Sequence, residues 1–267
     1  MSRVRVSVSV DVDWTAQDES SAVLLVRAAA APDQEIVEET LDVEGARVEE
    51  GPAAGDGGRP LRLHARPGAV RLRYRALVDV EQEGRAAIAD GLALPPASEL
   101  PFSLLPWTLP SRYAPSDLLG ATAQAELGLG PRERALLPAA AEWVRSRIAY
   151  ISGASDALTA ADETLLRRQG VCRDMAHLTV SLLRALEIPA RVVGCYAPLL
   201  EPPDFHALVE AHDGEGWRLM DATGLAPVET IVRVASGRDA ADIAWATGDE
   251  ALVLDDLRVA ARSVPET

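Results

Sequence analysis

A Gly-Val-Cys sequence stands directly before an apolar pattern with helical spacing, and this junction constrains the fold more than any other stretch of the chain. The cysteine is Cys172, and the apolar pattern after it contains Met175, Ala176, Leu178, Thr179, Leu182, Leu183 and Leu186. This spacing predicts that Cys172 is the first residue of a helix. Free backbone N–H groups and the helix dipole stabilise a thiolate at such a position, so the sequence predicts a nucleophilic cysteine.

Two short segments downstream can supply a base and an orienting group. The first begins at His206, the second ends at Asp221, and an Asp213-Gly214 pair lies between them. Asp-Gly is a common turn between antiparallel strands, so we expect His206 to lie close to Asp221 across a hairpin. The sequence therefore predicts a nucleophile, base and orienter set made of Cys172, His206 and Asp221.

The other histidines and the second cysteine fit a catalytic role less well. His64 falls in a β-rich region and His212 falls in the hairpin turn. His177 is five residues past Cys172, about 140° further around the helix axis, so we expect it to pack in the core. Cys195 lies in an apolar strand-like segment and is expected to be a buried structural thiol.

This ordered set resembles the bacterial transglutaminase-like proteins of the papain-like cysteine-enzyme superfamily. The stretches that carry the resemblance are Gly170-Val171-Cys172-Arg173-Asp174, residues 183–191, His206-Ala207, Gly216-Trp217, Asp221, Pro110-Ser111-Arg112-Tyr113 and residues 237–242. The resemblance implies an α+β fold, in which a papain-like transglutaminase core of helices packed on an antiparallel sheet carries an N-terminal β-sandwich. Leu208 stands where that family often has tryptophan, a departure that is expected to alter either the substrate groove or the packing over the histidine. Trp217 is expected in the core or in the groove wall.

Three regions are expected along the chain. Residues 1–90 are predicted to form the β-sandwich, because several short segments alternate apolar and polar residues. Residues 91–130 are rich in proline and large apolar residues, which predicts a connector packed on the next domain. Residues 131–267 are predicted to form the catalytic domain. Its expected elements are helices after residues 131 and 159, the second ending at Gly170, the Cys172 helix, and strands at 190–196, 206–211, 217–221, 231–235, 251–254 and 257–261.

Charge and composition narrow the possible partners. A formal net charge of −15 argues against nucleic acid, because phosphate binding depends on clustered cations. No apolar run approaches the roughly 20 residues that span a bilayer, and the first residues alternate as in a strand rather than a signal peptide. No membrane contact is therefore expected, and a cytoplasmic location is the default. Two cysteines and the spacing of the histidines fit no metal site, so neither a metal nor a cofactor is expected.

The expected chemistry is thiol-dependent acyl transfer at a peptide or glutamine-type amide bond of a protein or peptide substrate. Cys172 attacks the carbonyl, His206 moves protons, Asp221 orients the imidazole, and the Cys172 N–H is the first oxyanion donor. Water as acceptor gives a cysteine protease or amidase, which we favour. An amine acceptor gives a protein-glutamine transglutaminase, and a catalytically silent peptide-binding module is a third interpretation.

Overall fold

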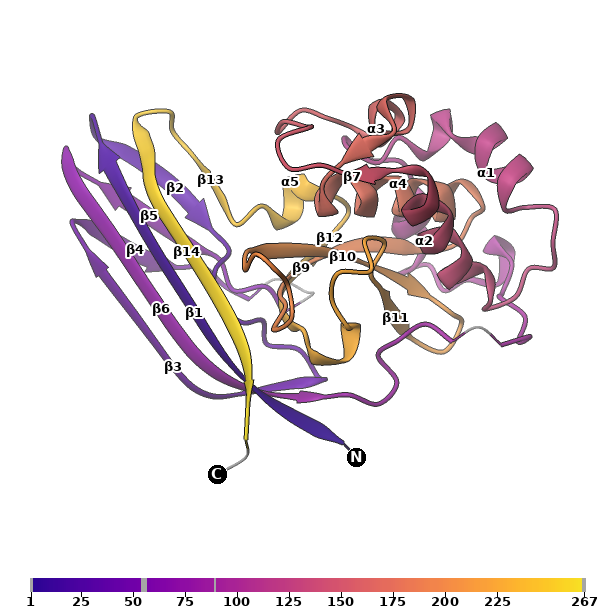
Figure 1. Cartoon of the computed structure of the whole chain (residues 1–267), viewed down its shortest axis with the longest axis horizontal. Helices are drawn as coiled ribbons and strands as arrows, with labels where there is room; N and C mark the ends of the chain where they lie inside the picture. Colours follow the sequence, from indigo (N-terminus) through magenta and orange to yellow (C-terminus); the bar gives the residue numbers. More distant parts are fainter. Residues whose placement is uncertain (1, 54–56, 89, 266–267) are drawn as a thin grey trace.

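A computed structural model of the chain describes residues 2–53, 57–88 and 90–265. Two four-stranded antiparallel sheets form one lobe, and a four-stranded sheet covered by helices forms the other (Figure 1). The fold is α+β, as the sequence predicts. Among the described residues, no helix is both long enough and apolar enough to cross a membrane.

The first lobe is a β-sandwich whose inner faces are apolar. Its strands are β1 (Arg3–Ala16), β2 (Ser20–Leu24), β3 (Gln34–Glu44), β4 (Ala46–Glu50), β5 (Leu61–Ala65), β6 (Gly68–Glu81), β13 (Ala246–Gly248) and β14 (Leu252–Val264). They form two sheets, in the orders β14-β1-β6-β3 and β13-β2-β5-β4. The alternate valines of β1 from Val6 to Val12 are buried in the core between these sheets. On the outer face, Arg75 of β6 forms an ion pair with Asp11 of β1.

Two strands near the C-terminus complete the sandwich. β14 runs antiparallel to β1 along most of its length, and β13 pairs with β2. The sequence predicts a catalytic domain over residues 131–267. The C-terminal boundary of this prediction is corrected, because both strands belong to the sandwich. The physical reason is that β14 covers the otherwise unpaired edge of β1, whose N–H and C=O groups need partners.

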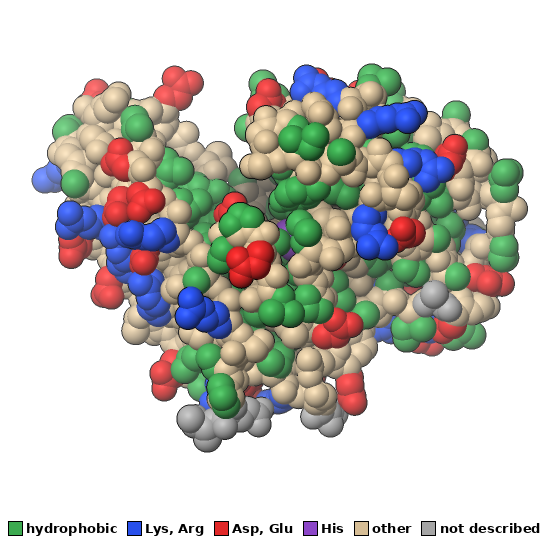
Figure 2. All heavy atoms as spheres, in the orientation of Figure 1, with side chains coloured by type: hydrophobic (Ala, Val, Ile, Leu, Met, Phe, Trp, Pro, Cys, Tyr) green, Lys and Arg blue, Asp and Glu red, His purple; other side chains and the backbone are tan. Residues whose placement is uncertain are grey.

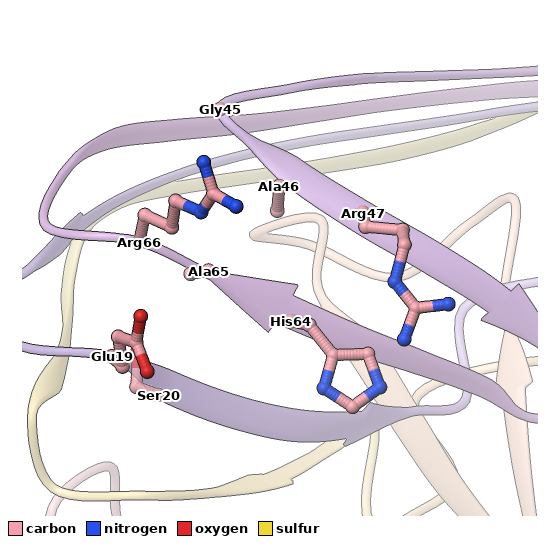
Figure 3. Close-up of a pocket in the computed structure, with 8 residues that line it drawn as sticks. All are labelled: Glu19, Ser20, Gly45, Ala46, Arg47, His64, Ala65 and Arg66. Carbon is pink, nitrogen blue, oxygen red and sulfur yellow. The ribbon is translucent and has the colours of Figure 1, made fainter.

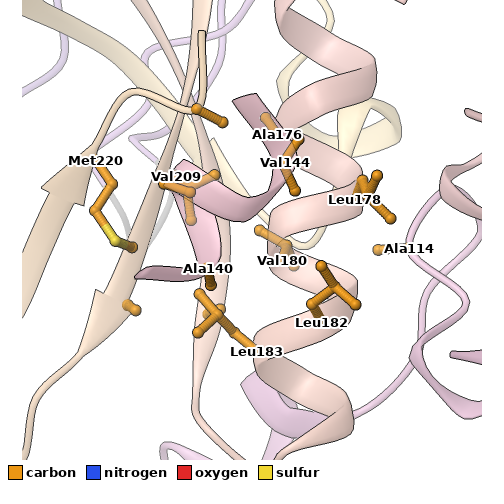
Figure 4. Packing of buried hydrophobic residues seen from close by; sticks show 14 of the residues in the cluster. Ala114, Ala140, Val144, Ala176, Leu178, Val180, Leu182, Leu183, Val209 and Met220 are labelled. Carbon is orange, nitrogen blue, oxygen red and sulfur yellow. The ribbon is translucent and has the colours of Figure 1, made fainter. Parts of the chain in front are cut away.

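The second lobe is built around the predicted Cys172 helix. Its sheet contains β9 (Ala190–Tyr196), β10 (Phe205–His212), β11 (Trp217–Met220) and β12 (Val232–Gly237), in the order β11-β10-β9-β12. The helix itself is α4 (Cys172–Ala185), with α2 (Leu136–Arg147) packed beside it. Val180 and Leu183 of α4 face Val209 of the sheet, whereas Leu178 points toward Ala114 of the connector (Figure 4). α4 is thus buried on opposite sides, which holds its first residue in place.

Short elements surround α4. They are the 3₁₀ helices η1 (Ala97–Glu99), η2 (Leu105–Thr108), η3 (Ser116–Leu118) and η4 (Val228–Thr230), the helices α1 (Gly120–Glu126), α3 (Ala161–Arg167) and α5 (Ala240–Ile243), and the parallel strands β7 (Ala149–Tyr150) and β8 (Gln169–Gly170). The expected end of α3 at Gly170 is wrong, because Arg168 adopts the left-handed conformation that ends the helix (φ 53°). Gly170 instead lies in β8, where a Cβ would come within 2.8 Å of Asp174 Cβ. A glycine is therefore needed where β8 approaches the start of α4.

Candidate active site

Cys172 is the first residue of α4, as the sequence predicts, and its side chain is partly exposed. Asp174, fully buried in the first turn, holds this helix start in place. Its Oδ2 accepts a hydrogen bond from the Val171 N–H at 2.8 Å and another from the Ser155 hydroxyl, while Oδ1 forms an ion pair with Arg173 at 2.8 Å. The Asp174 carboxylate therefore ties the residue before Cys172 to a neighbouring loop and does not point its charge at the thiol.

Tyr150 also contacts this helix start, and the sequence patterns give no signal for it. The parallel pairing of β7 with β8 sets Tyr150 opposite Gly170, and the Ile151 N–H donates to the Gly170 carbonyl at 2.9 Å. The Tyr150 hydroxyl interacts with both the backbone N–H and the thiol of Cys172. Burial and the neighbouring thiol raise the pKa of Tyr150 to about 12, so the phenol keeps its proton at neutral pH.

His206 and Asp221 come together across the hairpin of β10 and β11. Val209 pairs with Met220, so Asp221 follows the last paired residue of β11. His206 Nε2 lies 3.2 Å from Asp221 Oδ2, and the two side chains are 0% and 3% exposed.

The carboxylate of Asp221 is held by further donors. Its Oδ1 accepts from the Thr223 N–H and hydroxyl at 2.8 and 2.7 Å, and Oδ2 accepts from the Ala226 N–H at 2.9 Å. Burial raises the pKa of Asp221, but the hydrogen bonds with His206 and Thr223 outweigh it and lower the pKa overall. Asp221 is therefore an anion with a fixed orientation at neutral pH.

The imidazole of His206 is positively charged at neutral pH. Burial lowers the pKa of His206, but the interactions with Asp221 and Cys172 outweigh burial and raise it to about 9. Because Nε2 faces Asp221, the buried Nδ1 is the ring nitrogen left for Cys172.

Cys172 and His206 line the same cavity, which has a volume of about 680 Å³ and lies between the two lobes. Figure 2 shows the surface hollowed there, with hydrophobic side chains around the hollow. The other lining residues are Leu25, Arg112, Tyr113, Ala157, Arg173, Gly194, Cys195, Phe205, Ala207, Val234, Ala240, Ala241 and residues 243–248. The cavity is thus open to a ligand that contacts both the sandwich and the Cys172 lobe.

Of the two alternatives expected for Leu208 and Trp217, the one in which they border this groove is wrong. Leu208 is fully buried with Val193 and Leu219 in a separate cluster on the sheet. Trp217 pairs with His212 at the far end of the hairpin from His206, and the Arg191 guanidinium lies 4.1 Å from the centre of its ring. The position of Trp217 along the strand therefore keeps it away from Cys172.

The remaining histidines lie away from Cys172, as the sequence predicts, although His212 is the last residue of β10 and not part of the turn. His64 borders a cavity of about 460 Å³ on the sandwich, together with Arg47 and Arg66 (Figure 3). His177 is fully buried, and its Nε2 accepts a hydrogen bond from the Ala240 N–H at 3.0 Å. Within the described residues, no group of three or more His, Cys, Asp and Glu side chains is placed to hold a metal ion.

Cys195 is placed directly opposite His206 on the neighbouring strand β9 and is fully buried. Burial raises the pKa of the Cys195 thiol well above its ordinary value. This thiol therefore stays protonated and unreactive at neutral pH, although it is close to the base.

Three comparisons show which known proteins this chain is similar to. Residues 124–222, which include Cys172, His206 and Asp221, match the model of the transglutaminase-like superfamily. A solved structure of a candidate cysteine protease from Cytophaga hutchinsonii is 32% identical, with a TM-score of 0.91 over 100% of this chain and 93% of that one. An uncharacterized protein of Mycobacterium leprae is 30% identical over 146 residues, which are 51% of each chain. The matched part thus spans about half the length of this curated relative.

Proposed function

The chain belongs to the transglutaminase-like superfamily, and from this premise we propose that it is a thiol-dependent hydrolase of peptide or amide bonds. The observation that carries the proposal is the buried pair of His206 and Asp221 at a cavity that Cys172 also lines. A charged imidazole beside a cysteine at a helix start is the arrangement that a thiol nucleophile needs. The likeness to a candidate cysteine protease supports hydrolysis over crosslinking.

The proposed reaction has two steps. In the first, the Cys172 thiolate attacks the carbonyl carbon, and His206 gives its proton to the amine that leaves as the C–N bond breaks. In the second, water attacks the thioester while His206 takes its proton, and the carboxylic acid and the Cys172 thiolate are released. Asp221 fixes the orientation of the imidazole and stabilises its positive charge throughout.

Two donors beside the thiol are proposed to stabilise the oxyanion. The Cys172 N–H lies at the start of α4 and faces the developing charge. The Tyr150 hydroxyl interacts with Cys172 and stays protonated, so we propose it as the second donor. The carbonyl oxygen of the substrate then lies between a backbone group and a phenol.

The acceptor in the second step separates this proposal from its alternative, a protein-glutamine transglutaminase. All 26 basic residues of the chain are arginine, so the protein offers no lysine of its own as acyl acceptor. A crosslinking reaction therefore requires an amine from another molecule. The −15 net charge supports a peptide or protein substrate rather than nucleic acid.

The experiment that tests the proposal is mass spectrometry of a glutamine-containing peptide pool incubated with the protein, with and without a primary amine. We expect new peptide termini or deamidated glutamine with the unmodified protein and with Cys195→Ala, and neither product with Cys172→Ala. Amine adducts that require Cys172 would establish a transglutaminase instead. Equal activity of the Cys172→Ala variant would contradict the mechanism, and a protein with no Cys172-dependent product would be a binding module.

A further inference from the structure

Strand β13 is an edge strand whose free side borders the cavity of Cys172 and His206. Within the described part of the chain, β13 pairs with β2 alone. All three of its residues, Ala246, Thr247 and Gly248, line the cavity. Figure 1 shows β13 on the side of the sandwich that faces α5 and the second lobe. The sandwich therefore presents a strand edge, and not only side chains, to the candidate active site.

The register of β13 identifies which backbone groups are free. The Leu25 N–H donates to the Trp245 carbonyl at 2.9 Å, and the Asp249 N–H donates to the Ser21 carbonyl at 3.0 Å. The backbone N–H and C=O groups of residues 245, 247 and 249 therefore point toward β2. Because these groups alternate sides along a strand, the N–H and C=O of Ala246 and Gly248 point to the free edge.

The wall next to this edge is aromatic. The rings of Phe205 and Trp245 stack with their centres 5.4 Å apart and their planes 9° apart, and Leu25 also lines the cavity. Phe205 and His206 are consecutive residues of β10, and both line the cavity. An apolar side chain that projects from a strand on β13 would bury its surface here.

We propose that the acyl-side segment of a peptide substrate binds in extended form along β13 and adds a strand to the sandwich sheet at Ala246 and Gly248. Main-chain hydrogen bonds to a sheet edge provide affinity that is independent of sequence, and the aromatic wall provides selectivity. The inference rests on the proposed function and narrows its substrate class to unfolded peptide segments with free main-chain N–H groups. Folded helices and isolated small amides cannot form this ladder, so they are poor substrates.

The test measures how fast peptide-based reagents alkylate Cys172. The probe is acetyl-Ala-Ala-Ala-Phe chloromethyl ketone, compared with a series of analogues that each carry one N-methylated amide, and the readout is the second-order rate constant from intact mass spectrometry. Since only alternate N–H groups of a strand face β13, we expect N-methylation to slow labelling at alternate positions, by about tenfold for each lost hydrogen bond. Iodoacetamide, which has no peptide chain, reports the reactivity of Cys172 alone.

A pair of variants tests the same edge from the protein side. Ala246→Pro removes an outward-facing N–H, a position where an edge strand tolerates proline, and Ala246→Ser keeps that N–H. We expect Ala246→Pro to slow labelling by the peptide reagent about tenfold while the iodoacetamide rate is unchanged, because one hydrogen bond is lost. Ala246→Ser should slow labelling by the peptide reagent less than Ala246→Pro does.

The outcomes separate this inference from the proposed function. If iodoacetamide labels Cys172 but N-methylation gives no alternating pattern, the inference fails and the proposed function stands. If iodoacetamide does not label Cys172, the proposed function fails and the inference falls with it. If Ala246→Pro does not fold, the N-methyl series with the unmodified protein decides the question.

Discussion

His206 Nε2 lies 3.2 Å from Asp221 Oδ2, and this contact leaves the buried Nδ1 as the other ring nitrogen. The pair also contributes to the positive charge on the imidazole. Although burial lowers the pKa of His206, the hydrogen bond with Asp221 leads the interactions that raise it to about 9. The Asp221 carboxylate therefore helps to keep a proton on His206 at neutral pH.

Replacing Asp221 with asparagine should move the alkaline limit of activity to lower pH. Activity requires protonated His206, so the unmodified protein should lose kcat/KM as the pH rises through about 9. The Asp221→Asn variant lacks the negative charge that holds this proton, so its alkaline limb should lie at lower pH, and its maximal kcat/KM should fall roughly a hundredfold. The measurement is the pH profile of kcat/KM with a peptide selected from the pool. An unchanged alkaline limb would show that Asp221 does not set the charge of His206.

Replacing Tyr150 with phenylalanine should lower turnover without removing the reactivity of the thiol. An oxyanion forms when an amide is cleaved but not when iodoacetamide alkylates a thiolate. If the Tyr150 hydroxyl stabilises the oxyanion, kcat/KM should fall about 10- to 100-fold, while the iodoacetamide rate changes less than about threefold. An equal fall in both rates would instead mean that Tyr150 acts on the thiolate. Phenylalanine keeps the ring, so the packing of β7 is preserved.

The sequence predicts the parts of the site that depend on local patterns. The helical spacing after Cys172 and the turn before Asp221 each lie within a short stretch of sequence. The helix start and the hairpin can therefore be predicted from the sequence. Tyr150 is different, because β7 has only two residues and no periodicity. Its approach to Cys172 depends on pairing with β8, which no local pattern encodes.

The placement of β13 and β14 shows the same limit at the scale of the fold. Alternating apolar and polar residues identify β14 as a strand. Its partner β1, however, is at the opposite end of the sequence. Nothing in either segment specifies that pairing over a pairing within the second lobe. The sequence also does not show whether Leu208 faces the cavity, because that depends on the twist and burial of the whole sheet.

Replacing Asp174 with alanine should destabilise the protein through the start of α4. The variant leaves the partly buried Val171 N–H and Ser155 hydroxyl without their acceptor. We expect the free energy of unfolding in urea to fall by roughly 2–4 kcal/mol. Asp117→Ala, at an exposed aspartate of η3, is the control and should change stability by less than about 0.5 kcal/mol. Equal stability of the two variants would mean that Asp174 does not secure the helix start.

His177 should make the protein less stable as the pH falls from neutral. Its ring is fully buried against Tyr113, with centres 5.5 Å apart, and burial lowers the pKa of His177 to about 4. The unfolded chain, with an ordinary histidine pKa near 6.5, binds a proton between about pH 6.5 and 4 that the folded protein does not bind. The free energy of unfolding should therefore fall by about 1.4 kcal/mol per pH unit in this window from His177 alone, or roughly 3 kcal/mol in total.

The comparison that isolates this effect is His177→Gln. Glutamine can still accept the hydrogen bond that the Ala240 N–H donates to Nε2, but it does not titrate. Urea unfolding at several pH values between 4.5 and 7.5 should give a shallower loss of stability for the variant, even if its stability at pH 7.5 is lower. Because Ala240 lines the cavity, the same bond ties α4 to the wall of the candidate active site. Parallel curves for the two proteins would mean that His177 takes up its proton in the folded state.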